Sequence, residues 1–376
     1  MDKQPIRVLQ IIGKFGGGGV ESVVLNYYRH IDKSKIQYDF VIHNDSKIDI
    51  TAEVQSLGGR IYSITPYYKN LFRFMLDIHS ILKNNKYKIV HCNMNTISFF
   101  ALLVAWLDGV PIRILHNHST SSPNERKRNA IKFFLKPFAK LFANKYFACS
   151  RLAAVWMYGK KALIHKKVQI INNAVNLERY RFNPNIRRDL RQNLKIENKF
   201  VIGHVGRFMF PKNHEFILKI FYKFYMRHKD SVLILIGDGP LYSEIKQKAC
   251  KMGLAEAIIF LGLREDVANW YNIMDLFVLP SHYEGLPVVG IEAQANGIPI
   301  IVSDKVTKEL SITNLIHFES LSENIDSWIR FMEKVYVSKN REHCNTVYDM
   351  QKAGFDINTE ADKLKKIYLD LEKNLD

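Results

Sequence analysis

Two glutamates, Glu284 and Glu292, flank a loop of glycine, leucine and proline in the second half of the chain. An apolar run typical of a buried strand, residues 275–281, precedes the loop, and an alanine-containing helix start follows it. This order points backbone N–H groups and a helix N-terminus at an anionic ligand. Because carboxylates repel phosphate, we expect both glutamates to accept hydrogen bonds from hydroxyl groups beside it. A ligand with phosphate and many hydroxyl groups is a nucleotide sugar.

Two cations stand in a comparable place earlier in this half. Arg207, preceded by Gly206, and Lys212 follow the first strand-like run, and Gly237-Asp238-Gly239-Pro240 follows the next. Arginine binds a diphosphate through paired hydrogen bonds and lysine binds it as a point charge. We therefore expect both loops to line one edge of a cleft that holds a diphosphate.

A glycine-rich loop, residues 16–19, follows the first strand-like run of the chain and leads through Val20 and Glu21 into a helix. Glycines allow a close backbone approach to a ligand and leave N–H groups free to bind it. The loop lacks the Gly-x-Gly-x-x-Gly spacing of dinucleotide-binding proteins. Asp45, which follows the second strand, is the only support for a dehydrogenase, and we disfavour that class.

His116 and His118 lie on either side of Asn117, after another predicted strand. Three interpretations apply: polar filling of a loop, a metal site, or a contact with substrate. No Asp-x-Asp motif or further histidine cluster stands nearby to complete a metal site. We expect one of the two histidines to bind a sugar hydroxyl or to move a proton.

Short apolar runs rich in β-branched residues alternate with helical stretches in two successive sets. The runs are residues 8–12, 38–43, 88–92, 111–116 and 145–149 in the first set and 200–205, 232–236, 257–261, 276–280 and 299–302 in the second. Such runs indicate parallel sheets covered by helices on both faces. Two sets in succession predict two doubly wound, Rossmann-like α/β domains that face a cleft.

The predicted domains are residues 1–180 and 181–355, followed by a helical segment over 356–376. A length of 376 residues suits two domains of ordinary size. The link falls near residues 172–195, where Asn, Arg and one Pro replace the apolar periodicity. Apolar residues at helical intervals over 358–375 predict a terminal helix.

The composition, 47% hydrophobic and 24% charged, is that of a globular protein. The longest apolar run, residues 97–107, is shorter than the roughly 20 residues that cross a bilayer. The strand-like run from Ile6 has no signal-peptide layout before it. The four cysteines contain no Cys-x-x-Cys pair, which argues against a zinc site or disulfide framework and fits a reducing cytoplasm.

The formal net charge of +17 is concentrated in the first half. Residues 1–180 contain 27 Lys and Arg against 11 Asp and Glu, and the remainder contains 27 against 26. This asymmetry suggests that the first domain faces a membrane surface, a nucleic acid or an acidic substrate. The alternative is a solubility bias with no partner.

Residues 126–145 combine arginines and lysines with bulky apolar residues. The apolar residues are Ile131, Phe133, Phe134, Leu135, Phe138, Leu141 and Phe142. A basic amphipathic helix of this kind can lie in a membrane interface, and the alternative is a core-packing helix with a solvated basic face. Pro137 should start or kink the helix. No helix-turn-helix, zinc-finger or RNA-binding signature accompanies the segment, so we expect no nucleic-acid partner.

Taken in order, these motifs resemble the retaining glycosyltransferases of family 4, which have the GT-B fold and build bacterial capsular and exopolysaccharides and glycolipids. The resemblance extends over nearly the whole chain. It is carried by residues 18–21, 116–118, 171–176, 205–207, 212–213, 237–240, 260–262 and 280–292.

The resemblance assigns roles to individual residues. Arg207 and Lys212 would bind the donor diphosphate and stabilise the departing nucleotide. Glu284 would lie beside the transferred sugar, and Glu292 would accept hydrogen bonds from the ribose. Other donor contacts would come from Gly206, Gly237, Gly239, Leu263, Arg264, Gly285, Leu286, Pro287, Val288 and Val289. Gly18 and Gly19 would approach the phosphate or the acceptor, and either His116 or His118 would contact the sugar.

The chain departs from the family pattern at two places. The usual Asn-Gly-Val-Asp of the hinge reads Asn-Ala-Val-Asn at residues 173–176. Residues 304–309 replace a glycine-rich loop and leave Glu309 there as a donor contact. The resemblance also implies that the terminal helix crosses back to the first domain.

The implied reaction moves a hexose or N-acetylhexosamine, with retention, from a UDP-linked donor to a hydroxyl of a membrane-associated glycan-lipid acceptor. We expect no metal ion or other cofactor, and we expect Glu284 not to act as a nucleophile. The protein would be cytoplasmic and peripheral at the inner membrane surface, bound through its basic first domain. Two alternatives on the same scaffold are a nucleotide-sugar epimerase and a catalytically silent sugar-nucleotide-binding protein.

Overall fold

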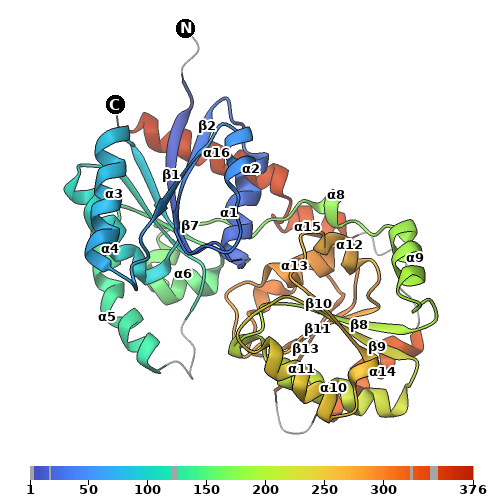
Figure 1. Cartoon of the computed structure of the whole chain (residues 1–376). Coiled ribbons are helices and arrows are strands. Elements are labelled where there is room, and N and C mark those ends of the chain that lie inside the picture. The colour runs from blue at the N-terminus through green and yellow to red at the C-terminus, as the bar shows by residue number, and fades with distance from the viewer. Residues whose placement is uncertain (1–3, 17, 121–125, 322–324, 339–345, 376) are drawn as a thin grey trace. The chain divides into compact units, whose positions relative to one another are not determined.

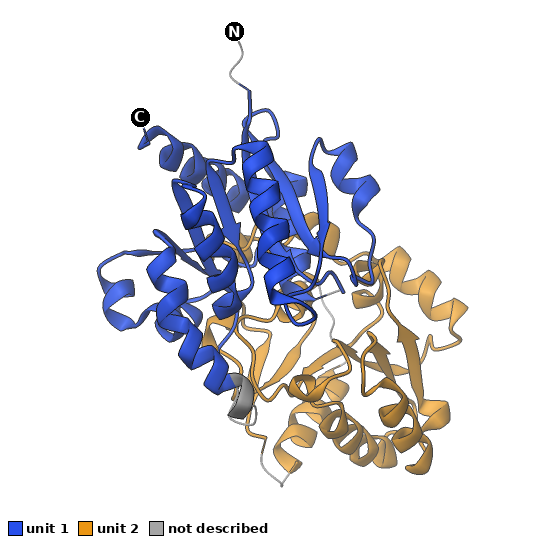
Figure 2. Cartoon of the chain, turned by 60° about the vertical axis from the view of Figure 1, so that its left-hand side comes forward, with its two compact units in different colours: residues 1–174, 357–376 blue, residues 175–356 orange. Residues whose placement is uncertain are grey.

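The computed structural model describes residues 4–16, 18–120, 126–321, 325–338 and 346–375. The chain divides into two compact units, and each contains its own sheet (Figures 1 and 2). Unit 1 consists of residues 1–174 and 357–376, and unit 2 consists of residues 175–356. The last helix therefore belongs to the first unit.

The sheet of unit 1 has seven parallel strands in the order β3-β2-β1-β4-β5-β6-β7. The strands are β1 (Ile6–Gly13), β2 (Ile36–His43), β3 (Arg60–Ile64), β4 (Ile89–Cys92), β5 (Ile112–Asn117), β6 (Lys145–Ala148) and β7 (Val168–Ile170). Every residue of the central strands β2 and β4 is buried, as expected for a sheet with helices on both faces.

The sheet of unit 2 has six parallel strands in the order β10-β9-β8-β11-β12-β13. The strands are β8 (Phe200–Val205), β9 (Ser231–Ile236), β10 (Ile258–Gly262), β11 (Leu276–Leu279), β12 (Ile300–Ser303) and β13 (Ile316–Glu319). The strand order reverses between β8 and β11, and ligands of doubly wound sheets bind beyond the carboxyl ends of the strands at such a point.

Helices cover the two sheets. Those of unit 1 are α1 (Gly19–His30), α2 (Thr51–Ser56), α3 (Leu71–Asn85), α4 (Ser98–Leu107), α5 (Arg126–Phe142), α6 (Arg151–Tyr158), α7 (Lys160–Ile164) and α16 (Ile357–Lys373), with the 3-10 turn η1 (Asn95–Ile97). Those of unit 2 are α8 (Leu177–Tyr180), α9 (Pro184–Asn193), α10 (His214–Arg227), α11 (Tyr242–Lys251), α12 (Val267–Tyr271), α13 (Val288–Ala295), α14 (Asp326–Ser338) and α15 (Val347–Lys352), with η2 (Phe210–Lys212), η3 (Ala255–Ala257) and η4 (Lys308–Leu310).

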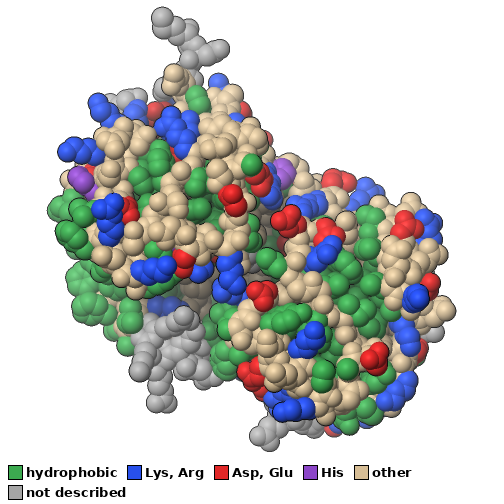
Figure 3. All heavy atoms as spheres, in the orientation of Figure 1, with side chains coloured by type: hydrophobic (Ala, Val, Ile, Leu, Met, Phe, Trp, Pro, Cys, Tyr) green, Lys and Arg blue, Asp and Glu red, His purple; other side chains and the backbone are tan. Residues whose placement is uncertain are grey.

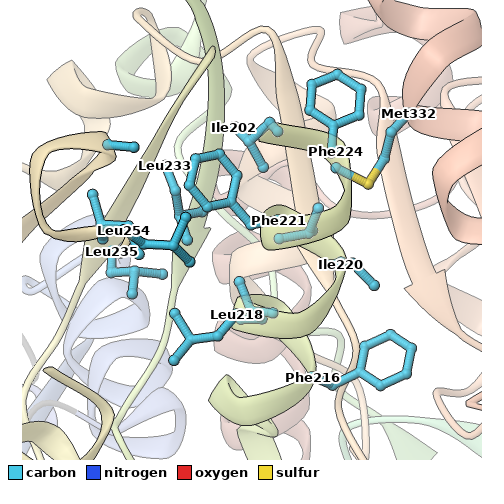
Figure 4. Packing of buried hydrophobic residues seen from close by; sticks show 14 of the residues in the cluster. Ile202, Phe216, Leu218, Ile220, Phe221, Phe224, Leu233, Leu235, Leu254 and Met332 are labelled. Carbon is cyan, nitrogen blue, oxygen red and sulfur yellow. The ribbon is translucent and has the colours of Figure 1, made fainter. Parts of the chain in front are cut away.

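Helix α10 shows how the sequence pattern builds the core of unit 2. Its residues Phe216, Ile220 and Phe224 recur every four positions and are buried (Figure 4). They belong to one apolar cluster with Leu233 of β9 and Met332 of α14. This packing fixes β8 and β9, whose carboxyl ends carry predicted site residues.

All ten predicted strands are present, and the doubly wound α/β class is confirmed. The prediction missed β3, β7 and β13, which all lie at edges of their sheets. An edge strand has one open side, and none of these three is buried throughout, so a continuous apolar run does not mark it. Helix α5 continues through Pro137, so the proline does not start it.

The cysteines are free where the structure describes them. Cys92 and Cys149 are buried and Cys250 is exposed, whereas Cys344 lies outside the described residues.

Candidate functional site

The predicted site residues fall into two groups, one in each unit. Unit 2 contains the cations Arg207 and Lys212 and the glutamates Glu284 and Glu292. Unit 1 contains the glycine-rich loop and the histidines.

In unit 2 the loops after β8 and β11 meet at the strand-order reversal. The two strands pair directly, with Ile202 opposite Leu276. Lys212 Nζ donates a hydrogen bond of 2.5 Å to Glu284 Oε1, and Ser281 Oγ donates one of 3.1 Å to the same oxygen. This ion pair thus joins the lysine predicted to bind the phosphate to the glutamate predicted to lie beside the sugar.

Arg207 lies in the same loop as Lys212, but its side chain is exposed. Within the described parts of the chain it forms no ion pair and no side-chain hydrogen bond. The backbone around it is fixed, because Gly206 N donates to Ile236 O at 2.9 Å and Phe208 N donates to Asp238 O at 3.0 Å. A free guanidinium on a fixed backbone suits the bidentate binding of an anion.

Gly237 and Gly239 have a packing role that the sequence did not reveal. A Cβ on Gly237 would lie 2.2 Å from Gly206 O, and one on Gly239 would lie 2.5 Å from Phe208 O. Gly237 also has a φ of +138°, which favours glycine. These glycines let the loops after β8 and β9 lie against each other; the donor contact predicted for them stays a prediction.

Residues 285–289 form the entry to α13. Gly285, Leu286 and Pro287 are buried, and the helix begins at Val288 with Val289 in its first turn. Pro287 occupies the N-cap position and provides no side-chain cap, so the first-turn N–H groups have no such acceptor. This is the arrangement that the sequence predicts for an anion-binding helix start.

Glu292, on the next turn of α13, is held by two tyrosines. Tyr180 donates to Oε1 at 2.7 Å and Tyr271 donates to Oε2 at 2.8 Å. Burial raises the pKa of Glu292 above its ordinary value, although both hydrogen bonds act to lower it. Sequence reasoning missed both tyrosines, because they end two other helices, α8 and α12, with no motif around them.

The loop after β10 holds Leu263 and Arg264. The Leu263 side chain is exposed, whereas Arg264 is bound by Asp266 through bonds of 2.8 and 2.9 Å and lies over the ring of Trp270. Gly237 N donates to Gly262 O at 2.8 Å, so this loop adjoins the loop after β9. Glu309 lies in η4, beyond β12. The donor contacts predicted for these residues stay predictions.

In unit 1 the glycine-rich loop differs from the expectation of free N–H groups. Gly16 N and Gly18 N both donate to Glu21 Oε2, at 2.8 and 2.7 Å. The carboxylate of Glu21 thus occupies the anion position at the start of α1, where Gly18 is the N-cap and Gly19 the first helical residue. The expectation of free N–H groups is wrong for these two amides. Gly17 lies outside the described residues.

His116 and His118 belong to a buried hydrogen-bond network that also contains His91 and has Tyr368 of α16 at its centre. One arm runs from the Tyr368 hydroxyl to His91 Nδ1 at 2.7 Å and from His91 Nε2 to His116 Nδ1 at 3.0 Å. The other arm runs through Gln10 and Asn93 to His118 Nε2, with bonds of 3.2, 3.0 and 3.0 Å. The sequence could not reveal this hub, because Gln10 and Tyr368 are 358 positions apart.

Burial determines the protonation state of these histidine rings. Burial lowers the pKa of His118 and of His91 to about 3, and the pKa of His116 lies lower than its ordinary value as well. All three are therefore neutral at physiological pH. His116 is 3% exposed and lies against His91, and His118 is 8% exposed; the substrate contact predicted for one of them stays a prediction.

Comparisons with known proteins agree with this arrangement. Residues 17–179 match the family described as Glycosyltransferase Family 4, and residues 185–315 match Glycosyl transferases group 1. The glycosyltransferase EpsF of Bacillus subtilis (strain 168) is 31% identical over 375 residues, which cover 98% of this chain and 97% of EpsF.

A second relative and a solved structure extend the comparison. A UDP-Gal:alpha-D-GlcNAc-diphosphoundecaprenol alpha-1,3-galactosyltransferase of Escherichia coli is 28% identical over 319 residues, 80% of each chain. The crystal structure of Anabaena HepE in complex with UDP-glucose superimposes with a TM-score of 0.80 at 16% identity, covering 97% of this chain and 100% of that chain. The chain therefore belongs to the family 4 glycosyltransferases and has their GT-B fold.

Proposed function

We propose that this glycosyltransferase moves a hexose or N-acetylhexosamine, with retention, from a UDP-sugar to a hydroxyl of a lipid-linked glycan during polysaccharide assembly. The observation that carries the proposal is the Lys212–Glu284 ion pair beside the exposed Arg207. This group combines positive charge for a diphosphate with a carboxylate for sugar hydroxyl groups.

The proposed mechanism places the main stabilisation at the leaving diphosphate. Negative charge grows there as the bond to the sugar breaks, and Arg207 and Lys212 offer fixed positive charge. The first-turn N–H groups of α13 add hydrogen-bond donors that carry partial positive charge and would also stabilise the leaving diphosphate. Glu284 shares its oxygen with Lys212 and Ser281, which suits a hydrogen-bond acceptor and not a nucleophile.

Relatives support the choice of donor and acceptor. The solved HepE structure contains UDP-glucose, and the Escherichia coli relative is named for UDP-Gal and a diphosphoundecaprenol-linked acceptor. We also propose that the reaction needs no metal ion. Among the residues described, no three His, Cys, Asp or Glu side chains are grouped so that they could hold one.

Helix α5 supports an acceptor at a membrane surface. Phe133, Phe134 and Leu141 of this helix face outward and are exposed by 79%, 67% and 70%, whereas Leu135 and Ala139 are buried. Lys132 and Lys136, in contrast, are partly buried. Hydrophobic side chains gather over α4 and α5 at the left of unit 1 (Figure 3). The helix thus packs against unit 1 on one side and carries an exposed apolar face on the other.

Apolar side chains that face outward among lysines fit the interface of an anionic membrane, into which they would insert. We therefore propose peripheral binding to the inner membrane surface through α5. None of the helices in the described part of the chain is both long and apolar enough to span a bilayer.

An acceptor-dependence assay tests the proposed reaction. UDP-, GDP- and ADP-sugars are incubated with the protein, with and without a polyprenyl-diphosphate-linked glycan. We expect release of UDP and a lengthened glycan only when the acceptor is present. Conversion of the donor without acceptor would indicate an epimerase, and binding without turnover would indicate a silent binding protein.

A further inference from the structure

We propose that Tyr180 and Tyr271 are positioning residues that hold Glu292 as an oriented hydrogen-bond acceptor for the ribose of the donor nucleotide. This inference rests on the proposed donor function and adds two residues that no family motif marks. It follows from the contacts of one carboxylate in the second turn of α13.

Each oxygen of Glu292 accepts one tyrosine hydroxyl, at 2.7 Å from Tyr180 and 2.8 Å from Tyr271. The two donors approach different oxygens, so the carboxylate plane is fixed at both ends. A carboxylate oxygen can accept more than one hydrogen bond. Capacity for ribose hydroxyl groups therefore remains after both tyrosines are bound, and Glu292 is itself only partly buried.

The tyrosines are themselves held in place. The backbone carbonyl of Tyr180 accepts a bond of 2.7 Å from Asn296 Nδ2, and its ring meets the ring of Tyr271 edge-on at 5.9 Å. Tyr271 is fully buried and packs on Phe277 of β11. Two rigid donors from α8 and α12 thus set the direction of one acceptor on α13.

The charged state of Glu292 depends on the same contacts. Burial favours the neutral acid, and the bonds from Tyr180 and Tyr271, followed by the charges of Arg179 and Lys212, favour the carboxylate. Burial raises the pKa of Tyr271 well above its ordinary value, and electrostatic repulsion from Glu292 and Tyr180 adds to this effect. The Tyr271 hydroxyl therefore keeps its proton and remains a hydrogen-bond donor. Loss of either hydroxyl would make Glu292 easier to protonate and a weaker acceptor.

The test is the binding of UDP between pH 5 and pH 8, measured by calorimetry. We compare the wild-type chain with Tyr271→Phe, Tyr180→Phe and Glu292→Gln. Because the terminal phosphate of UDP titrates near pH 6, the Glu292→Gln curve serves as the baseline for protonation of the ligand. Tyr225→Phe is the matched control, because that tyrosine hydroxyl on α10 has no described hydrogen bond.

Relative to the baseline, we expect wild-type affinity to fall as the pH drops through the pKa of Glu292. In each Phe variant this fall should move to higher pH by about half a unit to one unit, the effect of one hydrogen bond. At pH 7 the dissociation constant should rise about twofold to tenfold. Tyr225→Phe should follow the wild-type curve.

Carbon-13 NMR of the Glu292 carboxyl group, assigned by its loss in Glu292→Gln, gives a readout without ligand. We expect the pKa of Glu292 to rise in Tyr271→Phe and Tyr180→Phe. If UDP binds the wild-type chain and the curves of both Phe variants coincide with it, the positioning role is refuted. Failure of the wild-type chain to bind UDP, GDP or ADP would refute the donor function, and an unchanged NMR titration would separately refute the effect of the tyrosines.

Discussion

Lys212 Nζ lies 2.5 Å from Glu284 Oε1, and the two side chains are 17% and 18% exposed. Because the pair is largely buried, removal of one partner leaves the other uncompensated. We expect Lys212→Met to lose about 2.7–4 kcal/mol of transition-state stabilisation, or roughly 10²–10³ in kcat at saturating donor. In chemical denaturation, Lys212→Met/Glu284→Gln should cost less than the sum of the single variants. Additive losses would show that the pair is not coupled.

Arg207 should matter for turnover more than for stability, because its side chain is exposed and lies beside the proposed diphosphate site. Arg207→Ala should reduce kcat at saturating donor by about 10²–10³. Arg207→Lys should recover only part of the loss, since lysine cannot bind bidentately. Arg227→Ala, which removes a surface ion pair between Arg227 of α10 and Glu333 of α14, is the control. Near-normal turnover of Arg207→Ala would refute the assignment.

Gly237→Ala should destabilise unit 2, because the added methyl group would overlap Gly206 O. We expect a loss of about 3 kcal/mol or more in the free energy of unfolding. Gly253→Ala is a matched control: Gly253 has a φ of +71° but nothing lies within 4 Å of the new Cβ. Backbone strain alone should cost about 1–2 kcal/mol there. Equal losses in the two variants would contradict the close contact between loops.

The buried histidines predict lower stability in acid. Burial, with smaller effects from His204 and Lys212, lowers the pKa of His214 to about 2, and burial lowers the pKa of His204 to about 3. These groups take up protons near pH 6.5 only after unfolding. The two neutral histidines therefore contribute fully to the free energy of unfolding above pH 6.5. This contribution is lost as the pH falls from 6.5 toward their pKa values in the folded state. We expect denaturant titrations to give a lower free energy of unfolding at pH 5 than at pH 7.

His214→Phe isolates one of these groups. Neither ring nitrogen of His214 has a described hydrogen-bond partner, and the ring stacks on Phe208, so phenylalanine can keep the packing. Between pH 6 and pH 4 the variant should lose about 1.4 kcal/mol less stability per pH unit than the wild-type chain. An unchanged slope would contradict the low pKa of His214.

The outward face of α5 should control membrane binding. We expect Phe133→Ser/Phe134→Ser to weaken sedimentation with anionic vesicles by about tenfold or more, since each buried phenylalanine contributes about 1.5–3 kcal/mol. Val337→Ser, which changes a residue of unit 2 exposed by 75%, is the control for loss of an exposed apolar side chain. Binding of wild-type protein should also fall with added salt. Equal, salt-independent binding of all three proteins would contradict the proposal.

Sequence periodicity predicted the central strands because burial on both faces requires continuous apolar runs, as in β2 and β8. The same reasoning failed at the sheet edges, where strands such as β3 are half-exposed. The motifs also predicted that Lys212 and Glu284 lie close together, because both follow the carboxyl ends of parallel strands in one sheet.

What the sequence could not predict are contacts between distant segments. Tyr180 and Tyr271 are 112 and 21 positions from Glu292, and neither belongs to a recurring pattern. The hydrogen bonds from the loop amides to Glu21 could not be predicted for another reason. A glutamate at the third helical position occurs both in helices whose first N–H groups are free and in helices where its carboxylate accepts from them. Only three-dimensional proximity distinguishes these cases.

The position of Tyr368 has a consequence for biosynthesis. At about 5–20 residues per second, a ribosome needs roughly 20 to 70 seconds to make the 358 positions that separate Gln10 from this tyrosine. Throughout that interval the interior polar groups of the first sheet, His91 among them, lack their final partner. The unit that is translated first is thus completed last, because its final helix is made only at the end of synthesis.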